Sequence, residues 1–270
     1  DVFATATIEG GGAAATSAVE RTHISLLDAE FGFAPDSFAP DFFDAGADTP
    51  ERDAGAHPDL LTIPFDASTV PAPVSVNPFL TVAHESLRDL EIDLPPGSLI
   101  NPTAVGECTP ADLTWGVCPA SSQVGRIDTR SFPFLTRSVS FSAVTTGLFN
   151  ISHPRGVIAD LALQFVNAPL HFNVSLDPAN RYALRIAASN LNETRPLFSQ
   201  MLTFWGVPAD RMHDSERCPQ FTNKSLTGIG GDTAEECSTE VVPKPFLTVP
   251  SQCETAVSYT HLTLPTTSRV

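Results

Sequence analysis

The amino-acid sequence predicts an all-β protein built from antiparallel β-sandwich-like units. The first observation is the spread of 24 prolines and 16 glycines along 270 residues, because proline removes a backbone donor and interrupts long helices. The second is the apolar composition, with 18 phenylalanines, two methionines and many β-branched residues, which favours strands. The third is a set of segments in which apolar and polar residues alternate between turn-forming residues, as in half-buried strands.

The N-terminal part of the chain contains short strand-like pieces separated by polar stretches. Residues 1–22 begin with one such piece and continue with small and polar residues, which predicts the end of a preceding module followed by a linker. Residues 31–43 are rich in phenylalanine and interrupted by proline. A polar stretch at 44–58 separates them from an apolar run at 60–65. We therefore expect proline-interrupted strands in this region.

One strand and one short helix are predicted in the middle of the chain. At residues 87–94 apolar residues alternate with acidic ones: Leu90, Ile92 and Leu94 against Asp89, Glu91 and Asp93. This alternation predicts a half-buried strand, which two prolines and a glycine at 95–97 bring to an end. Residues 109–115 favour a short helical turn, with Thr109 as its N-cap and Pro110 in its first position.

The strongest alternation lies at residues 157–189 and predicts an antiparallel β-meander. Apolar residues alternate with polar or small ones in two runs: Leu161, Leu163 and Phe165, then Leu170, Phe172, Val174 and Leu176. After turn-forming residues at 177–180 the alternation resumes on Tyr182, Leu184, Ile186 and Ala188. We expect a hairpin at 170–188 with one face in water. We place a first sandwich-like domain at 23–145 and a second, incomplete one at 146–256.

The net charge of −16 argues against a nucleic-acid function. With 15 basic against 31 acidic residues, the chain lacks the basic footprint that phosphates need, and the same charge disfavours an anionic membrane surface. No apolar run reaches the roughly 18 residues that cross a bilayer. Lys224 and Lys244 are the only lysines. The preference for arginine, together with many alanines, glycines and prolines, indicates a GC-rich genome and a bacterial source.

The cysteines predict disulfide bonds in an exported protein. Five of them lie in loop-like, polar stretches: Cys108, Cys118, Cys218, Cys237 and Cys253. The chain has no C-x-x-C pair and no histidine at zinc-finger spacing, which argues against a structural zinc site. Disulfides in an oxidising compartment account for these cysteines better.

Two pairings are expected from the spacing of the cysteines. Cys108 and Cys118 should close a short loop, to which Pro110 and Gly116 give the necessary bends. We expect Trp115 to pack beneath this bridge. The expected partner of Cys218 is either Cys237 or Cys253, and the remaining cysteine of that set would stay unpaired or bind a partner outside this sequence.

One acidic loop is a candidate metal site. Asp210, Asp214 and Glu216 cluster with His213 after Trp205, and carboxylates at this density could coordinate calcium. However, the chain has no D-x-D-x-D-G loop, and the spacing matches no known ligand scheme. The alternative is a polar turn in which aspartate side chains cap backbone groups. The sequence indicates no cofactor.

No catalytic motif is recognisable in the sequence. A G-x-S-x-G nucleophile elbow is absent, and four histidines stand apart from one another: His57, His84, His153 and His171. His171 points outward in the predicted hairpin, so we expect a solvated surface side chain. Trp115 and Trp205 could form a platform for a sugar, although two tryptophans more often pack in cores or corners. Glycoside hydrolysis would need two carboxylates facing each other in a cleft.

Five loop motifs occur in one order along the chain. They are G-A-H-P-D-L at 55–60, D-L-P-P-G-S-L-I-N-P-T-A-V at 93–105, C-P-A-S-S-Q-V-G at 118–125, F-W-G-V-P-A-D-R-M-H-D-S-E-R-C at 204–218 and P-F-L-T-V-P-S-Q-C at 245–253. Over residues 30–256 this combination resembles a family of large secreted or cell-surface proteins of high-GC Gram-positive bacteria. The family has no established activity. The resemblance therefore implies an exported, multi-module β protein and carries over no catalytic residues.

The last residues, 257–270, resemble translated sequencing adapter. Their first ten, V-S-Y-T-H-L-T-L-P-T, match a translation of the transposon end and primer that tagmentation kits attach to DNA. We therefore leave 257–270 out of the predicted domains as an artefactual tail and expect it to be unpacked. The start at Asp1 without a methionine adds the expectation of a fragment without its natural ends.

These observations predict a non-enzymatic, exported structural or adhesive module of a larger bacterial surface protein, located outside the cell or at its surface. The leading alternative is a carbohydrate-binding or carbohydrate-active domain, and a calcium-dependent adhesion module is the third. Expected partners are neighbouring domains of the same chain and a cell-surface glycan or protein. Nucleic acid is not an expected partner, and we expect no membrane insertion.

Overall fold

The structure is all-β, as predicted. The computed structural model describes residues 2–22, 32–44, 49–71, 81–83, 85–131, 142–153, 156–165, 168–191, 197–217 and 238–251. Antiparallel strands dominate these ranges and the helices are short, which confirms the fold class. The contacts divide the chain into two compact units, Asp1–Glu30 and Phe31–Val270.

A β-hairpin makes up the described part of the N-terminal unit. Strand β1 (Val2–Gly10) pairs antiparallel with β2 (Ala13–Thr22), from Val2 opposite Thr22 to Gly10 opposite Ala13. Gly10, Gly11 and Gly12 have φ angles of 153°, 59° and 77°, which glycine adopts without the steric cost of a Cβ atom. The prediction of a linker within residues 1–22 is therefore wrong, because both sides of this glycine turn form strands.

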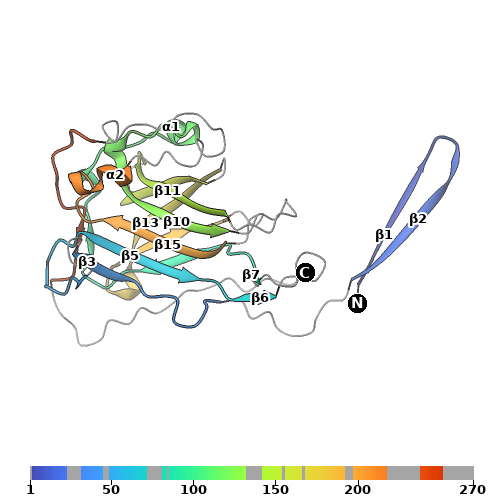
Figure 1. Ribbon diagram of the computed structural model, residues 1–270, viewed down its shortest axis with the longest axis horizontal. Helices are drawn as coiled ribbons and strands as arrows, with labels where there is room; N and C mark the ends of the chain where they lie inside the picture. Colours follow the sequence, from blue (N-terminus) through green and yellow to red (C-terminus); the bar gives the residue numbers. More distant parts are fainter. Residues whose placement is uncertain are drawn as a thin grey trace. The chain divides into compact units, whose positions relative to one another are not determined.

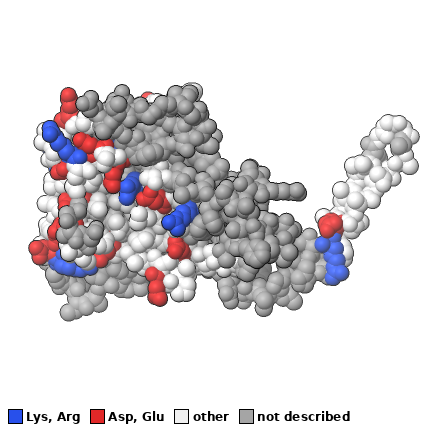
Figure 2. Space-filling view, viewed as in Figure 1, with Lys and Arg blue, Asp and Glu red and all other residues white. Residues whose placement is uncertain are grey.

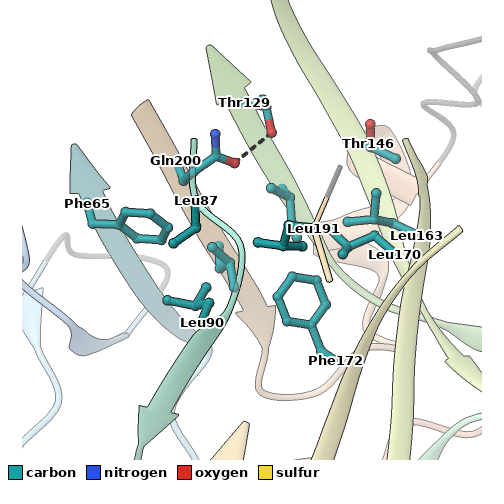
Figure 3. A pocket seen from close by; sticks show the side chains of 12 residues that line it. Phe65, Leu87, Leu90, Thr129, Thr146, Leu163, Leu170, Phe172, Leu191 and Gln200 are labelled. Carbon is teal, nitrogen blue, oxygen red and sulfur yellow. Dashed lines mark hydrogen bonds between the residues drawn. The ribbon is translucent and has the colours of Figure 1, made fainter. Parts of the chain in front are cut away.

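Ten strands of the second unit form one antiparallel sheet. Their order across the sheet is β4-β3-β5-β15-β10-β11-β12-β13-β14-β8. Their bounds are β3 (Asp41–Asp44), β4 (Thr49–Pro50), β5 (Leu60–Asp66), β8 (Leu90–Asp93), β10 (Gln123–Ser131), β11 (Ser142–Ile151), β12 (Ala159–Phe165), β13 (Ala168–Asp177), β14 (Ala183–Ala188) and β15 (Leu197–Trp205). The sheet curls toward one face (Figure 1). As a result, side chains from β5, β8 and β13, which are not neighbours in the sheet, line the same cavity (Figure 3).

Smaller elements complete the second unit. Two further sheets have two strands each, β6 (Thr69–Pro71) with β7 (Thr81–Ala83) and β9 (Leu99–Ile100) with β16 (Leu247–Thr248). The short helices are η1 (Pro102–Ala104), α1 (Pro110–Trp115), η2 (Ala120–Ser122), η3 (Pro178–Asn180), η4 (Arg211–His213) and α2 (Asp214–Arg217). In the described ranges the longest helix is α1, with six residues, and no helix there is long and apolar enough to cross a membrane.

The predicted division into domains at 23–145 and 146–256 differs from the structure. The boundary between them falls inside β11, which pairs with β10 on one side and β12 on the other. Strands from the two halves also alternate in the sheet, since β5 pairs with β15 and β8 pairs with β14. One unit from Phe31 onward therefore replaces the two predicted ones.

The core lies on the inner face of the curled sheet. The predicted strand at 87–94 is confirmed by β8, and Leu90, Ile92 and Leu94 are each 3% exposed. The predicted hairpin is confirmed by β13 and β14, which bury four of its apolar residues: Phe172, Val174, Leu184 and Ile186. Leu176, near the end of β13, and Tyr182, in the turn before β14, are exposed instead.

A second, smaller core lies on the outer face of the sheet beneath α1. Phe149, Ile151 and Ala162 point away from the main core and pack with Leu113 and the two cysteines of the α1 loop. Their neighbours along the strands, Leu148, Leu161 and Leu163, belong to the main core. Strand alternation therefore gives β11 and β12 two buried faces in this region, one of which α1 covers (Figure 1).

Candidate functional site

Asp210, Asp214 and Glu216, the predicted metal candidates, lie after β15 in η4 and α2. Asp210 is the N-cap of η4, where its side chain accepts a hydrogen bond from the backbone N–H of Met212 at 2.9 Å. Asp214 forms an ion pair with Arg217. In the part of the chain that the structure describes, no group of three potential metal ligands comes together. These acids therefore act in helix capping and ion pairing, and the arrangement gives no support to a calcium site.

Glu216 joins α2 to the sheet. Its Oε1 accepts a hydrogen bond from Nη1 of Arg126 on β10 at 2.9 Å, and its Oε2 accepts one from Nε1 of Trp205 at 3.2 Å. The imidazole of His213, whose Nδ1 is 3.9 Å from Oε2, stacks on the indole of Trp205. His213 and then Arg126 hold the pKa of Glu216 below its ordinary value, although partial burial opposes them.

Arg217 is the most completely buried charge of this cluster, with 1% of its surface exposed. Its Nη2 and Nε donate to the carbonyl oxygen of Pro208 at 2.9 and 3.2 Å, and further hydrogen bonds reach the Asp210 carbonyl and the Asp214 carboxylate. The guanidinium lies 6.0 Å from the centre of the Trp205 ring, within reach of a cation–π interaction. Acceptors from the loop 208–214 thus converge on the guanidinium of Arg217.

The low pKa of Glu216 predicts an acid-dependent part of the stability. A carboxyl with a lowered folded-state pKa stabilises the fold above its unfolded pKa, and this stabilisation is lost as the pH falls through the folded pKa. We expect Glu216→Gln to lower the free energy of unfolding by about 1–2 kcal/mol at pH 5. The loss should shrink toward pH 3, as measured by urea unfolding.

Glu240→Gln is the control, since Glu240 is exposed and its replacement should not change the pH dependence. A Glu216→Gln variant whose stability falls as steeply as that of the wild type from pH 5 to pH 3 would contradict the assignment.

The Cys108–Cys118 disulfide is present, as predicted. The two Cα atoms are 5.3 Å apart, and the bridge lies beside Leu113, which is 1% exposed. Helix α1 begins as predicted: Thr109 accepts a hydrogen bond from the backbone N–H of Asp112 and Pro110 follows it. Gly116 ends the helix in the left-handed conformation, with φ of 67°.

Trp115 does not pack beneath the bridge, and this prediction is wrong. Its side chain is 78% exposed, and Val117 beside it is 61% exposed. The reason is helical geometry: Leu113 faces the sheet, and a residue two positions later points about 200° around the helix axis. The second tryptophan, Trp205, is 0% exposed and lies in the core. The two therefore form no common platform for a sugar.

His171 lies on the outer face of β13, as predicted, but it is not isolated. Its Nδ1 is 2.9 Å from Oδ2 of Asp160 on the neighbouring strand β12. Within the described ranges the ring has no hydrogen bond to a hydroxyl or thiol. His57 bonds through Nδ1 to the Leu247 carbonyl and to Thr248, and His84 lies outside the described residues. Because the Leu247 carbonyl can only accept a hydrogen bond, Nδ1 of His57 is the donor to it. The same nitrogen therefore cannot take a proton from the Thr248 hydroxyl that it contacts.

Acidic side chains on the outer face of the sheet are paired with arginine. Arg185 on β14 bonds to Asp93 at 2.6 Å and to Asp177 at 2.8 Å, and Glu91 lies 3.7 Å away. Hydrogen bonding to Asp93 raises the pKa of Arg185 above its ordinary value. On the face in Figure 2 the basic side chains likewise lie next to acidic ones. The acidic face of the strand at 87–94 is thus partly neutralised by a neighbouring strand.

Several predictions concern residues outside the described ranges. These are the pairings of Cys218, Cys237 and Cys253 and the unpacked state of residues 257–270. Comparison of the chain with protein-family models, with curated proteins and with solved structures found no match.

Proposed function

We propose that the chain is a non-enzymatic, exported adhesive module of a larger bacterial surface protein, with α1 as its contact element. The observation that carries the proposal is the exposure of Trp115, at 78%, on a helix whose two flanks are joined by a disulfide. Trp115 is exposed next to Val117, which is 61% exposed, and tryptophan is enriched among the residues that dominate binding energy.

The rigidity of the α1 loop favours binding. The disulfide fixes both ends of the loop, Leu113 anchors its middle in the outer core, and the Thr109 cap fixes its start. Binding through such a loop orders few additional groups, so less of the interaction energy is lost to conformational entropy. Trp115 and Val117 together offer an apolar surface that is already in place.

The same disulfide supports export. Structural disulfides form and persist in oxidising compartments and are rare in the cytosol. The net charge of −16 supports partners other than nucleic acid. A non-enzymatic role is supported by the pairing of acids with arginines, since Glu216 and Asp93 are engaged in ion pairs with Arg126 and Arg185.

Carbohydrate binding is the second candidate, favoured by the open face of Trp115. An indole can stack on the apolar face of a sugar ring while polar groups beside it bond to hydroxyls. The nearest acid on α1, Asp112, already accepts a hydrogen bond from the Thr109 hydroxyl at 2.8 Å. The proposed partner of this surface is a cell-surface protein or a cell-surface glycan. Protease and periodate treatment of the cell walls distinguishes the two.

The test measures binding of the fluorescently labelled chain to cell walls of a high-GC Gram-positive bacterium. We expect Trp115→Ala to weaken binding by about 30-fold or more, which corresponds to a hot-spot loss of about 2 kcal/mol. Tyr182→Ala is the matched control, because Tyr182 is an aromatic residue 65% exposed in the turn after β13. It should bind like the wild type.

Protease treatment of the walls should abolish binding to a protein partner, and periodate treatment should abolish binding to a glycan. The proposal fails if the wild type does not bind the walls, or if Trp115→Ala binds them as tightly as Tyr182→Ala does. Circular dichroism of both variants establishes that they are folded.

A further inference from the structure

The β1–β2 hairpin (Figure 1) is a sheet of two strands, and no third strand joins it among the described residues. Each strand therefore turns alternate backbone N–H and C=O groups toward an outer edge that the hairpin leaves unpaired. In residues 3–8 and 14–21 every side chain is exposed. A hairpin of this kind is marginally stable in water and needs a third strand or a packed face.

The faces of the hairpin offer little apolar surface to a packing partner. Nine of the fourteen side chains at 3–8 and 14–21 are alanine, serine or threonine. The larger apolar ones are divided between the faces, because the register places Phe3 and Val19 on one face and Ile8 on the other. A partner that completes this sheet therefore has to be a strand that bonds to one of its edges.

The edge of β2 has features that oppose pairing. The register shifts between Ile8 and Gly10, where residues 14–15 of β2 face a single residue of β1. The extra residue places a β-bulge in β2. Glu20 and Arg21 add charges near the other end of the same strand. Bulges and charged side chains are the means by which natural edge strands avoid unintended partners.

The edge of β1 lacks these features. Its first seven residues, V-F-A-T-A-T-I at 2–8, pair with β2 without a shift and include no charged residue, proline or glycine. Five of the seven are β-branched or aromatic and therefore favour a strand. An uncharged, regular edge of this length is a template for pairing with another chain.

The segment 2–8 is complementary to a second copy of itself. A two-fold axis through Thr5 pairs two copies of β1 antiparallel over the whole segment. Phe3 of each copy then lies opposite Thr7 of the other, and aromatic and β-branched residues pair favourably across strands. Each copy of the chain carries a net charge of −16, so an uncharged segment lets two copies approach each other with little local repulsion.

We propose that β1 forms the interface of a homodimer in which the two hairpins join into one four-stranded antiparallel sheet. The order β2-β1-β1-β2 leaves the bulged and charged β2 strands at both outer edges, so the assembly closes at two copies. The contact consists of one pair of strands, and we expect a weak, reversible dimer with a Kd on the order of 10 µM. This interface is independent of the proposed adhesive surface on α1, so either can fail in experiment without the other.

Sedimentation equilibrium of the 270-residue chain tests the proposal. We expect a monomer of 28.7 kDa in equilibrium with a species of twice this mass. Ala6→Lys should weaken the association by about tenfold or more, because the two-fold axis places the introduced ammonium groups of the two copies at diagonal positions within reach of each other.

Ala18→Lys is the matched control. Ala18 lies directly opposite Ala6 in the hairpin and on the same face, and its replacement makes the same change in net charge on the other strand. This variant should dimerise like the wild type.

Salt and hydrogen exchange provide two further readouts. Raising the salt concentration from about 0.05 to about 0.5 M should strengthen the dimer, because it screens the repulsion between two acidic copies. The outward-directed backbone amides of β1 should exchange more slowly as the protein concentration rises, and those on the outer edge of β2 should not respond.

The proposal is overturned if the wild type stays monomeric at about 100 µM, roughly ten times the expected Kd. It is equally overturned if species larger than a dimer accumulate, if salt weakens the association, or if the two lysine variants dimerise alike. Hydrogen exchange of the wild type decides the question even if Ala6→Lys disrupts the hairpin: the protection must appear on β1.

Discussion

Replacing Arg217 with alanine is expected to lower the free energy of unfolding by about 3–5 kcal/mol, the cost of removing one partner from a buried ion pair. Arg217 is 1% exposed, and its guanidinium satisfies the carbonyls of Pro208 and Asp210 and the carboxylate of Asp214. Without it, the buried Pro208 carbonyl and the partly buried acceptors of Asp210 and Asp214 lose their donors. Urea unfolding followed by circular dichroism measures the change.

Arg211→Ala is the matched control for this prediction. Arg211 lies in η4, six positions before Arg217, and its side chain is exposed. Its replacement should change stability by no more than about 0.5 kcal/mol, as is usual for surface positions. Similar losses for the two variants would show that Arg217 does not organise the loop 208–214.

Removal of the Cys108–Cys118 disulfide by a double substitution with serine is expected to cost about 3 kcal/mol. In the chain-entropy model the bridge restricts the unfolded chain, and a loop of this length contributes about that amount. Because the cysteines are 0% and 6% exposed against Phe149 and Ile151, the serine hydroxyls would also be poorly placed in an apolar core. The expected result is a lower urea midpoint, with a slope no smaller than that of the wild type because the unfolded chain loses a restraint.

A reducing agent supplies the control for the disulfide. Dithiothreitol should lower the urea midpoint of the wild type toward that of the double-serine variant and should change the variant much less. A variant as stable as the oxidised wild type would show that the outer core beneath α1 holds without the bridge.

Local features were predictable from the sequence because they depend on neighbouring residues. The alternation of Leu90, Ile92 and Leu94, the β13–β14 hairpin and the capped start of α1 each involve fewer than about twenty consecutive residues. The Cys108–Cys118 pairing has the same character, since ten positions separate the two cysteines.

Pairings between distant segments were not predictable. Nothing in the residues of β5 indicates that it lies beside β15, or in those of β8 that it lies beside β14. Without these pairings the sequence predicted two sandwich-like domains, whereas one ten-stranded sheet joins both parts of the chain. The β1–β2 hairpin carried a local signal, three glycines between two stretches of β-favouring residues. The small side chains of residues 13–22 were instead interpreted as those of a linker.

The candidate site shows the same limit. Asp214 and Glu216 stood out as an acidic cluster, but the partner that defines the role of Glu216 is Arg126, 90 positions earlier on β10. Thr129, Thr146 and Gln200 are polar residues in strands whose other inward-facing positions are apolar. Only the register of β11, β10 and β15 brings these residues together.

The role of Trp115 as the contact residue is tested most directly by the fluorescence of the two tryptophans. Trp115 is 78% exposed and Trp205 is 0% exposed, so the neutral quencher acrylamide should quench an accessible and a protected population. Trp115 supplies the accessible one, and Trp205 serves as the internal reference. Addition of cell walls that bind the chain should protect the accessible population from quenching and shift its emission to shorter wavelength. Binding of the walls with no change in the quenching of that population would place the contact elsewhere and contradict the proposed function of α1.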